Sequence, residues 1–289
     1  MSTAAPHRIF DRAAYRRRRE RQSASDPILA SETAAQIVER ISSINRHFEQ
    51  ALDLSSRKAV FEVLRPAATN WVRAGYAEDQ PDIIADEEAL PFAEATFDLV
   101  TSVLSLHCVN DLPGTLIQIR RALKPDGVFM ATLFGGETLR ELRLAFTAAE
   151  AATLGGASPR VAPFADVRDL GGLLQRAGFT LPVADLERTT ILYRDPLRLF
   201  TDLRALGETN VLAQRRPNFL SRGLLQAVLA EYSQRFTDDQ GRVPATFDIV
   251  YLIGWAPHES QPKPLRPGSA KASLADALRR PDPFRDTSA

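Results

Sequence analysis

The chain has 289 residues and balances 36 basic against 36 acidic side chains, so its formal net charge is zero. A neutral chain has no global field that attracts nucleic acid, and we expect no nucleic-acid partner. The single cysteine, Cys108, excludes an internal disulfide.

No apolar run approaches the roughly 20 residues that a membrane-spanning helix needs. The N-terminus lacks the apolar stretch of a secretory signal, and Asp11, Glu20 and Asp26 argue against a mitochondrial presequence. Together with the lone cysteine, these features predict a soluble, cytoplasmic protein. We expect membrane contact only through a partner, and the sequence leaves the oligomeric state open.

Residues 1–30 form a basic N-terminal arm with seven arginines between Arg8 and Arg21. One interpretation is a solvated helix or frayed arm. The other is an arm that touches an acidic partner or closes over a cleft, with Ile9, Phe10 and Tyr15 as apolar anchors. The sequence leaves both open.

Strand and helix patterns alternate along residues 31–257, and this alternation predicts one α/β domain. Asp111 and Asp195 can cap helices, each with a proline in the first turn, and Gly178 and Gly207 can end helices. Helical residues at about 195–240 form an elaboration before the last strand, and residues 258–289 predict an extended or disordered tail. The predicted strands cover residues 49–54, 70–74, 82–85, 97–106, 128–134, 181–193 and 246–255.

The stretch from Ile83 to Gly136 organises this domain. An apolar run at 97–106 is typical of a strand buried on both faces, and Leu112, Leu116, Ile119 and Leu123 form one helical stripe. The turn Pro125-Asp126-Gly127 then leads to the next strand. In such parallel sheets the ligand lies beyond the carboxyl ends of the strands, so residues 105–110 and 134–137 should face a cleft.

The order of the segments LDL, ADEEALPF, FDLVTSVLSLH, LKPDG and GGLLQRAGF resembles the class I S-adenosylmethionine-dependent methyltransferases. Within that family the chain is similar to the biotin-pathway malonyl-carrier methyltransferases. It is more similar to the mitochondrial complex I assembly factors of the arginine-hydroxylase type and their bacterial relatives. This resemblance implies a doubly wound, seven-stranded, mostly parallel sheet of Rossmann-like type, and S-adenosylmethionine as cofactor.

The resemblance also implies a set of cofactor-binding residues at this edge of the sheet. Asp53 ends the first strand, and it either helps to hold the cofactor loop or caps the next helix. Asp86 and Glu87 stand where the family contacts the adenine end, although Asp86 could instead only cap its own loop. Leu104 and Ser105 end the fourth strand.

Two departures from the family pattern predict weak cofactor binding. The family's loop glycines are replaced by Ser55, Arg57 and Ala59. A Cβ here hinders both a left-handed backbone and close approach of the ligand. Arg57 could still pair with the cofactor's carboxylate. The acidic residue that binds the ribose is replaced by Gly75, with Glu78 or Asp79 as substitutes if the loop is shifted.

The catalytic candidates are His107 and Glu137. Histidine can act as an acid or a base near neutral pH, and Glu137 could meet an arginine substrate. The alternatives are a structural histidine and an acid placed in the first turn of a helix. His107, Glu137, Asp86 and His258 show no recognised metal-ligand spacing, so we predict no metal site.

Three functions remain open. The chain could be a methyltransferase-like protein that acts on or assembles respiratory complex I. It could instead hydroxylate an arginine of a complex I subunit, which would then be its protein substrate. The third reading is a non-catalytic assembly chaperone with a methyltransferase fold.

Overall fold

The computed structural model describes residues 8–19, 28–55, 57–76, 80–216 and 218–262. Residues 1–257 form one compact unit and residues 258–289 a second, of which residues 258–262 are described. Most of the predicted tail therefore lies outside the described residues.

A seven-stranded sheet with the order β3-β2-β1-β4-β5-β7-β6 forms the centre of the first unit. The pairs among β3, β2, β1, β4 and β5 are parallel, and β7 runs antiparallel to both of its neighbours. This confirms the predicted doubly wound, mostly parallel fold. The strands are β1 Gln50–Asp53, β2 Asn70–Gly75, β3 Ile83–Ile84, β4 Phe97–Val103, β5 Leu123–Phe134, β6 Thr180–Tyr193 and β7 Val243–Trp255.

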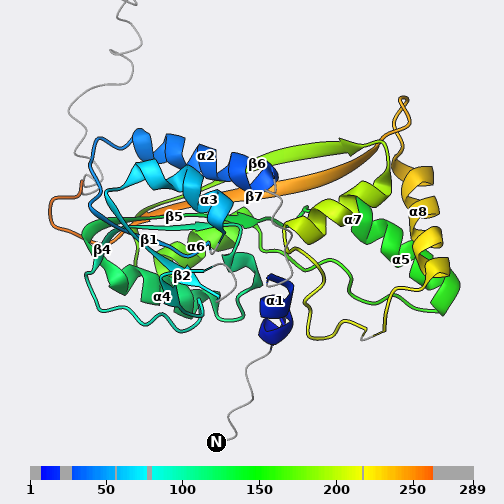
Figure 1. The fold of residues 1–289 in the computed structure, drawn as a ribbon, viewed down its shortest axis with the longest axis horizontal. Helices are drawn as coiled ribbons and strands as arrows, with labels where there is room; N and C mark the ends of the chain where they lie inside the picture. The colour runs from blue at the N-terminus through cyan, green and yellow to red at the C-terminus, as the bar shows by residue number, and fades with distance from the viewer. Residues whose placement is uncertain (1–7, 20–27, 56, 77–79, 217, 263–289) are drawn as a thin grey trace, which may run out of the picture. The chain divides into compact units, whose positions relative to one another are not determined.

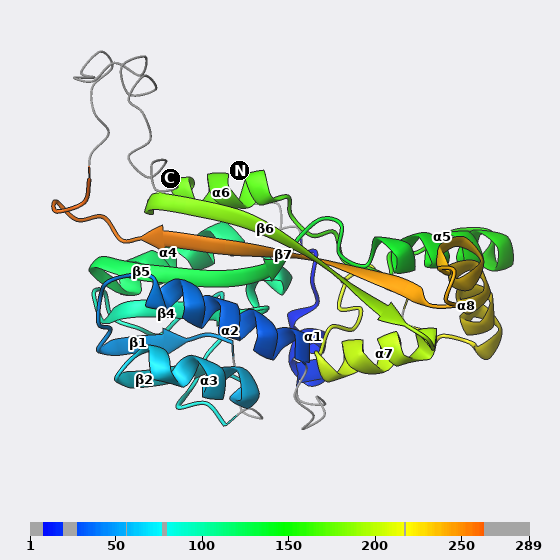
Figure 2. The ribbon, with the colours of Figure 1, turned by 90° about the horizontal axis from the view of Figure 1, so that it is seen from above.

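Helices cover both faces of the sheet. In Figure 1, α2 and α3 lie on one face and α4 and α6 on the other. Figure 2 shows β6 and β7 running past the rest of the sheet towards α5, α7 and α8. The α-helices are α1 Arg12–Arg19, α2 Ile28–Ser42, α3 Lys58–Leu64, α4 Leu112–Ala122, α5 Arg140–Leu154, α6 Val167–Arg176, α7 Pro196–Ala205 and α8 Arg222–Phe236, and the short 3-10 turns are η1 Arg65–Ala67 and η3 Leu106–Cys108. No described helix is long and apolar enough to cross a membrane.

Local sequence explains how several elements begin and end. The Asp111 carboxylate accepts a hydrogen bond from the Gly114 N–H at 2.9 Å and caps α4, as predicted. Asp195 caps α7 in the same way through the Leu197 N–H. Gly178 and Gly207 follow α6 and α7 with positive φ, which glycine adopts without a steric cost.

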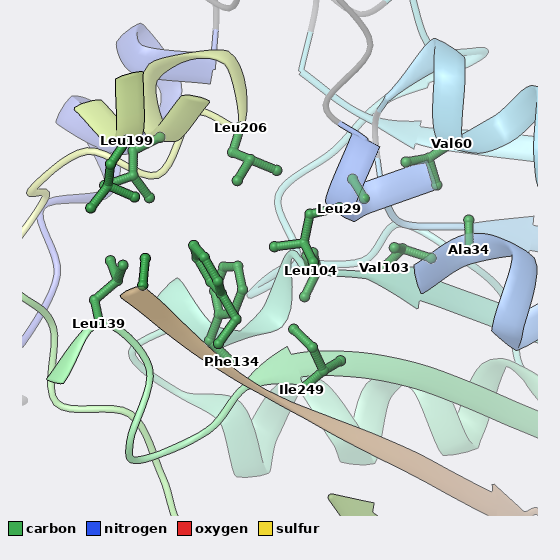
Figure 3. Packing of buried hydrophobic residues seen from close by; sticks show 14 of the residues in the cluster. Leu29, Ala34, Val60, Val103, Leu104, Phe134, Leu139, Leu199, Leu206 and Ile249 are labelled. Carbon is green, nitrogen blue, oxygen red and sulfur yellow. The ribbon is translucent and has the colours of Figure 1, made fainter. Parts of the chain in front are cut away.

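Two apolar clusters lie on opposite faces of the sheet. The first contains Ile37 of α2 and extends to α5, α7 and α8, whereas the second contains Ile119 of α4 and residues of α6. Figure 3 shows Phe134 of the first cluster among Leu104, Leu139 and Leu206. Phe134 ends β5, so this cluster continues to the carboxyl edge of the sheet.

Three predicted strand boundaries are wrong by three residues or more, and one of them is the start of β7, which lies at Val243 rather than at residue 246. The strand expected to begin at residue 128 begins at Leu123, which pairs with Phe97 of β4 and is therefore not on the helical stripe. Asp126 takes a φ of 62° within β5, and the pairing shifts register there. The strand expected at 97–106 ends at Val103, because Leu104 has a φ of 47° and turns the chain into η3.

The N-terminal arm is docked rather than solvated over residues 10–19. Phe10 and Tyr15 are buried at 5% and 1% exposure. The Asp11 N–H donates to the Val211 carbonyl, and the Asp11 carboxylate pairs with Arg215 at 2.8 Å. In Figure 2, α1 lies between the sheet and α7.

Candidate functional site

The acidic side chains predicted to meet the adenine end of a cofactor hold arginines of α1 instead. Asp86 accepts a hydrogen bond from Arg12 at 2.8 Å and also pairs with Arg16. Glu87, which is 4% exposed, pairs with Arg12 and accepts hydrogen bonds from the Ser105 and Tyr76 hydroxyls at 2.8 and 2.6 Å. The structure therefore brings Asp86, Glu87 and Ser105 together, and the Arg12 guanidinium lies between the two carboxylates.

The loop after β1 is closed by its own side chains and by α1. The Asp53 Oδ1 atom accepts a hydrogen bond from the Ser55 N–H at 2.9 Å, and the Ser55 carbonyl accepts one from Arg19 at 2.6 Å. The Ser55 hydroxyl accepts from the Val103 N–H. Asp53 therefore holds this turn, rather than capping α3, whose N-cap residue is Arg57. Burial raises the pKa of Asp53 to about 6.

Arg57 joins this loop to the segment after α7. Its side chain donates to the Leu206 carbonyl at 2.8 Å and lies 3.4 Å from the Glu208 carboxylate. Arg57 is 5% exposed, so it is not oriented towards solvent or an open ligand site. The Arg57 side chain thus packs between two segments that are far apart in the sequence.

The predicted catalytic histidine has a buried acidic partner. The His107 Nε2 atom lies 3.0 Å from the Glu208 carboxylate, and the His107 ring packs on Phe134 and Phe164. Although burial opposes it, His107 and Arg57 lower the pKa of Glu208, so this carboxylate stays charged. The His107 Nδ1 atom has no hydrogen-bond partner among the described residues. The pair resembles a base with an orienting acid.

A cavity of about 590 Å³ lies beside this pair, between α1, α5 and α7. Glu208 and Cys108 are part of its lining. The apolar lining includes Phe134, Phe146, Phe164, Phe200 and Phe247, and the basic lining consists of Arg17, Arg18, Arg160, Arg204, Arg215 and Arg216. A cavity of this size can hold a ligand or an extended side chain from a partner.

His107, Cys108 and Glu208 also form a group that could hold a metal ion. One ligand atom from each lies within 4.8 Å of the others. Burial raises the pKa of the Cys108 thiol, and Glu208 adds to this, so a metal would have to displace the thiol proton. Spacing in the sequence did not indicate this group, since Glu208 follows His107 by 101 residues.

The remaining predicted residues lie apart from this pair or outside the described residues. Glu137 is half exposed, and its carboxylate lies 3.7 Å from Arg140. Leu104 is fully buried, and its N–H donates to the Thr132 carbonyl. Gly75 ends β2, whereas Glu78 and Asp79 lie outside the described residues.

As arranged here, the residues do not fit S-adenosylmethionine. Arg12 and Arg16 neutralise Asp86 and Glu87, and Arg19 uses the Ser55 carbonyl. A cationic sulfonium beside three guanidinium groups would be repelled. One feature remains of a polar ligand site: the Asp53 Oδ2 atom is buried without a partner among the described residues.

Five residues of this site were not predicted: Arg12, Arg16, Arg19, Tyr76 and Glu208. Arg12, Arg16 and Arg19 belong to the arginine run, whose charge pattern suggested docking onto acids without identifying them. No motif surrounds Tyr76 or Glu208. Only the tertiary structure brings them to the sheet edge.

Comparison with known proteins identifies relatives along most of the chain. Residues 52–131 match the family described as "Methyltransferase domain". The protein named "Arginine-hydroxylase NDUFAF5, mitochondrial" is 40% identical in Danio rerio, over 93% of this chain and 89% of its own, and 40% identical in Homo sapiens, over 93% and 83%. A malonyl-[acyl-carrier protein] O-methyltransferase of Halorhodospira halophila is 35% identical, over 79% of this chain and 81% of its own.

The similar solved structures share the fold at low identity. A putative methyltransferase from Bacillus halodurans has a TM-score of 0.51 and 15% identity, covering 78% of this chain and 99% of its own. The YcgJ protein of Bacillus subtilis has a TM-score of 0.51 and 11% identity, covering 78% and 98%. These likenesses support the Rossmann-like methyltransferase fold.

The predicted cytoplasmic location is wrong by the same comparison. The NDUFAF5 proteins of Danio rerio, Rattus norvegicus and Homo sapiens are named as mitochondrial. The prediction relied on acidic residues near the N-terminus and on one cysteine. Neither feature identifies a compartment, because targeting is read by receptors and a reducing environment is not confined to the cytoplasm.

Proposed function

This chain belongs to the family of methyltransferase-fold proteins that includes the NDUFAF5 arginine-hydroxylases, and we propose that it hydroxylates an arginine of a respiratory complex I subunit. The name of its relatives supports the reaction, and the resemblance to complex I assembly factors supports the partner. The observation that carries the choice is the sheet edge, where Arg12, Arg16 and Arg19 contact Asp86 and Ser55, two residues that the resemblance assigns to the cofactor.

The reaction inserts one oxygen atom of dioxygen into a C–H bond of the arginine side chain. The second oxygen atom leaves as water, which takes two protons and two electrons from a reductant. Such chemistry requires a redox-active group. His107, Cys108 and Glu208 offer nitrogen, sulfur and oxygen donors of the types that bind transition metals.

The chain's own residues would orient the donor atoms of this group. Glu208 holds the His107 ring through Nε2, which leaves Nδ1 as the ring atom with which His107 would hold the redox-active group. Phe134 and Phe164 pack on the ring and exclude water from it. An apolar wall of this kind strengthens the electrostatic contacts within the site.

Mass spectrometry of the complex I subunits, with and without this protein, tests the proposal. The wild-type protein should add one oxygen atom to an arginine, and His107→Asn should abolish the addition. His47→Asn is the matched control, since His47 is exposed and contacts only Thr69 among the partners seen. The control should retain the addition.

Other outcomes of this measurement contradict the proposal. A gain of one methyl group would identify methyl transfer. An arginine that stays unmodified while complex I assembly still depends on the protein would identify a non-catalytic chaperone. Full hydroxylation by a folded His107→Asn variant would remove His107 from the mechanism.

A further inference from the structure

The geometry points to a guanidinium-binding notch at the sheet edge, which Arg12 occupies within the same chain. We propose that the substrate arginine takes the place of Arg12, so that α1 acts as an intramolecular plug. This inference rests on the proposed arginine substrate. It adds the site that binds the side chain and the step that opens that site.

The notch surrounds one guanidinium with four different partners. Arg12 Nη2 donates to the Tyr76 hydroxyl at 2.6 Å and to Asp86 at 2.8 Å, and it also pairs with Glu87. Arg12 Nη1 donates to the Cys108 carbonyl at 3.0 Å. Partners on two sides of a planar group match the fork of a guanidinium better than the single point charge of an ammonium.

Contacts other than Arg12 hold the acidic side chains of the notch in place. The Ser105 hydroxyl donates to Glu87 at 2.8 Å, and the Glu88 N–H donates to Asp86 at 3.0 Å. The Thr115 hydroxyl donates to the Glu87 carbonyl and so holds the backbone of this residue. The two carboxylates therefore stay oriented when Arg12 leaves, and such buried charges strongly favour another cation over an empty site.

Arg12 is an imperfect occupant on a small helix. Its Nε atom is buried with no hydrogen-bond partner among the described residues, and it lies 3.8 Å from Glu88. The helix has eight residues, of which Ala14, Tyr15 and Arg19 are buried. An unpaired buried donor costs free energy, so an arginine that approaches at a better angle can compete with it.

The notch and the cavity share α1 as a wall. Arg12, Arg16 and Arg19 recur at helical spacing and contact the sheet edge. Arg17 and Arg18 line the cavity beside Glu208. Release of α1 would therefore open both spaces at once. The backbone of Cys108, next to His107, forms part of the notch, so a bound arginine would lie near the candidate catalytic pair.

Isothermal titration with N-acetyl-arginine methylamide tests the proposal without any turnover. An intramolecular occupant competes at an effective concentration of roughly millimolar or more. The Arg12→Ala variant should therefore bind this probe at least about tenfold more tightly than the wild type. The matching citrulline amide, which has the same shape without the charge, should show no gain. Arg121→Ala removes an exposed arginine that pairs with the exposed Glu94, and this variant should bind the probe like the wild type.

A second substitution locates the binding. Glu87→Gln, added to Arg12→Ala, should remove the gain. The proposal is overturned if a folded Arg12→Ala variant binds the arginine amide no better than the wild type, or if the citrulline amide gains equally. The proposal would also be overturned if Arg12→Ala bound S-adenosylmethionine more tightly than the wild type but did not bind the arginine amide more tightly. In that case α1 would cover a nucleoside-binding site.

Arg12→Gln serves as the second variant if Arg12→Ala fails to fold, because it keeps the aliphatic stem. The result of this titration and the result of the hydroxylation measurement can be told apart. Arginine binding without hydroxylation would leave the notch in place and remove the proposed reaction. Hydroxylation by a protein whose notch fails the titration would do the reverse.

Discussion

Asp53 shows how one buried carboxyl can connect the candidate site to the stability of the fold. Its Oδ1 atom holds the Ser55 N–H, whereas its Oδ2 atom is buried with no partner among the described residues. Burial raises its pKa from 3.8 to about 6. Between these values the folded protein keeps a proton that the unfolded chain releases. The free energy of unfolding therefore falls as the pH rises through this window.

Asp53→Asn should remove this pH dependence. The shift of the Asp53 pKa by about two units corresponds to about 3 kcal/mol in the free energy of unfolding. The wild type should lose this stability between about pH 4 and pH 6, and the variant should not. Urea unfolding at several pH values measures the difference. Asp185→Asn, at an exposed carboxylate, is the control and should parallel the wild type. If the stability of Asp53→Asn changed with pH just as that of the wild type does, the Asp53 carboxyl would be ionised in the folded protein at these pH values.

At the scale of elements, the loop between β1 and α3 is connected to the segment after α7 through one arginine. Arg57 donates to the Leu206 carbonyl and pairs with Glu208, which in turn holds His107. Arg57 thereby joins two distant parts of the chain. Its side chain is part of the packing, and it also contacts the Glu208 carboxylate that lies against His107.

Arg57→Gly should consequently weaken the fold without restoring a cofactor site. The substitution removes a donor from the Leu206 carbonyl and leaves His107 as a partner of Glu208, so the loss should be about 1–3 kcal/mol. Lys58→Gly is the matched control: Lys58 is exposed in the first turn of α3, and its loss should cost about 1 kcal/mol or less. Urea unfolding measures both.

Titration of Arg57→Gly with S-adenosylmethionine checks the second half of this prediction. We expect no binding, since Arg12 and Arg19 still occupy the sheet edge. Binding by this single variant would show that the loop alone had excluded the cofactor.

At the scale of the whole molecule, the sheet separates two apolar clusters. Ile37 of α2 belongs to one and Ile119 of α4 to the other, and both are almost completely buried. The two faces touch different strand residues, so a small loss of packing on one face should not be transmitted to the other.

Ile37→Val and Ile119→Val should each destabilise the protein by about 0.5–1.5 kcal/mol. Their effects should add within about 0.5 kcal/mol in the double variant, measured by urea unfolding. Ile37→Val combined with Ile41→Val, on the same face of α2, provides the coupled comparison. The separation would be contradicted if Ile37→Val and Ile119→Val deviated from additivity as much as Ile37→Val and Ile41→Val do.

The order of elements, the helix caps and the parallel sheet follow from the sequence, because each depends on residues a few positions apart. Asp111 caps α4 through the Gly114 N–H, and the apolar run at β4 is buried throughout. These features come from local periodicity and from turn chemistry.

The contents of the site were decided by tertiary structure. Arg12 meets Glu87 across 75 residues, and His107 meets Glu208 across 101. The early start of β5 likewise depends on Leu123 pairing with Phe97 of another strand. A charge in the sequence does not carry the identity of its partner. That choice is made where burial removes water and leaves each charged group dependent on the side chains that the fold places beside it.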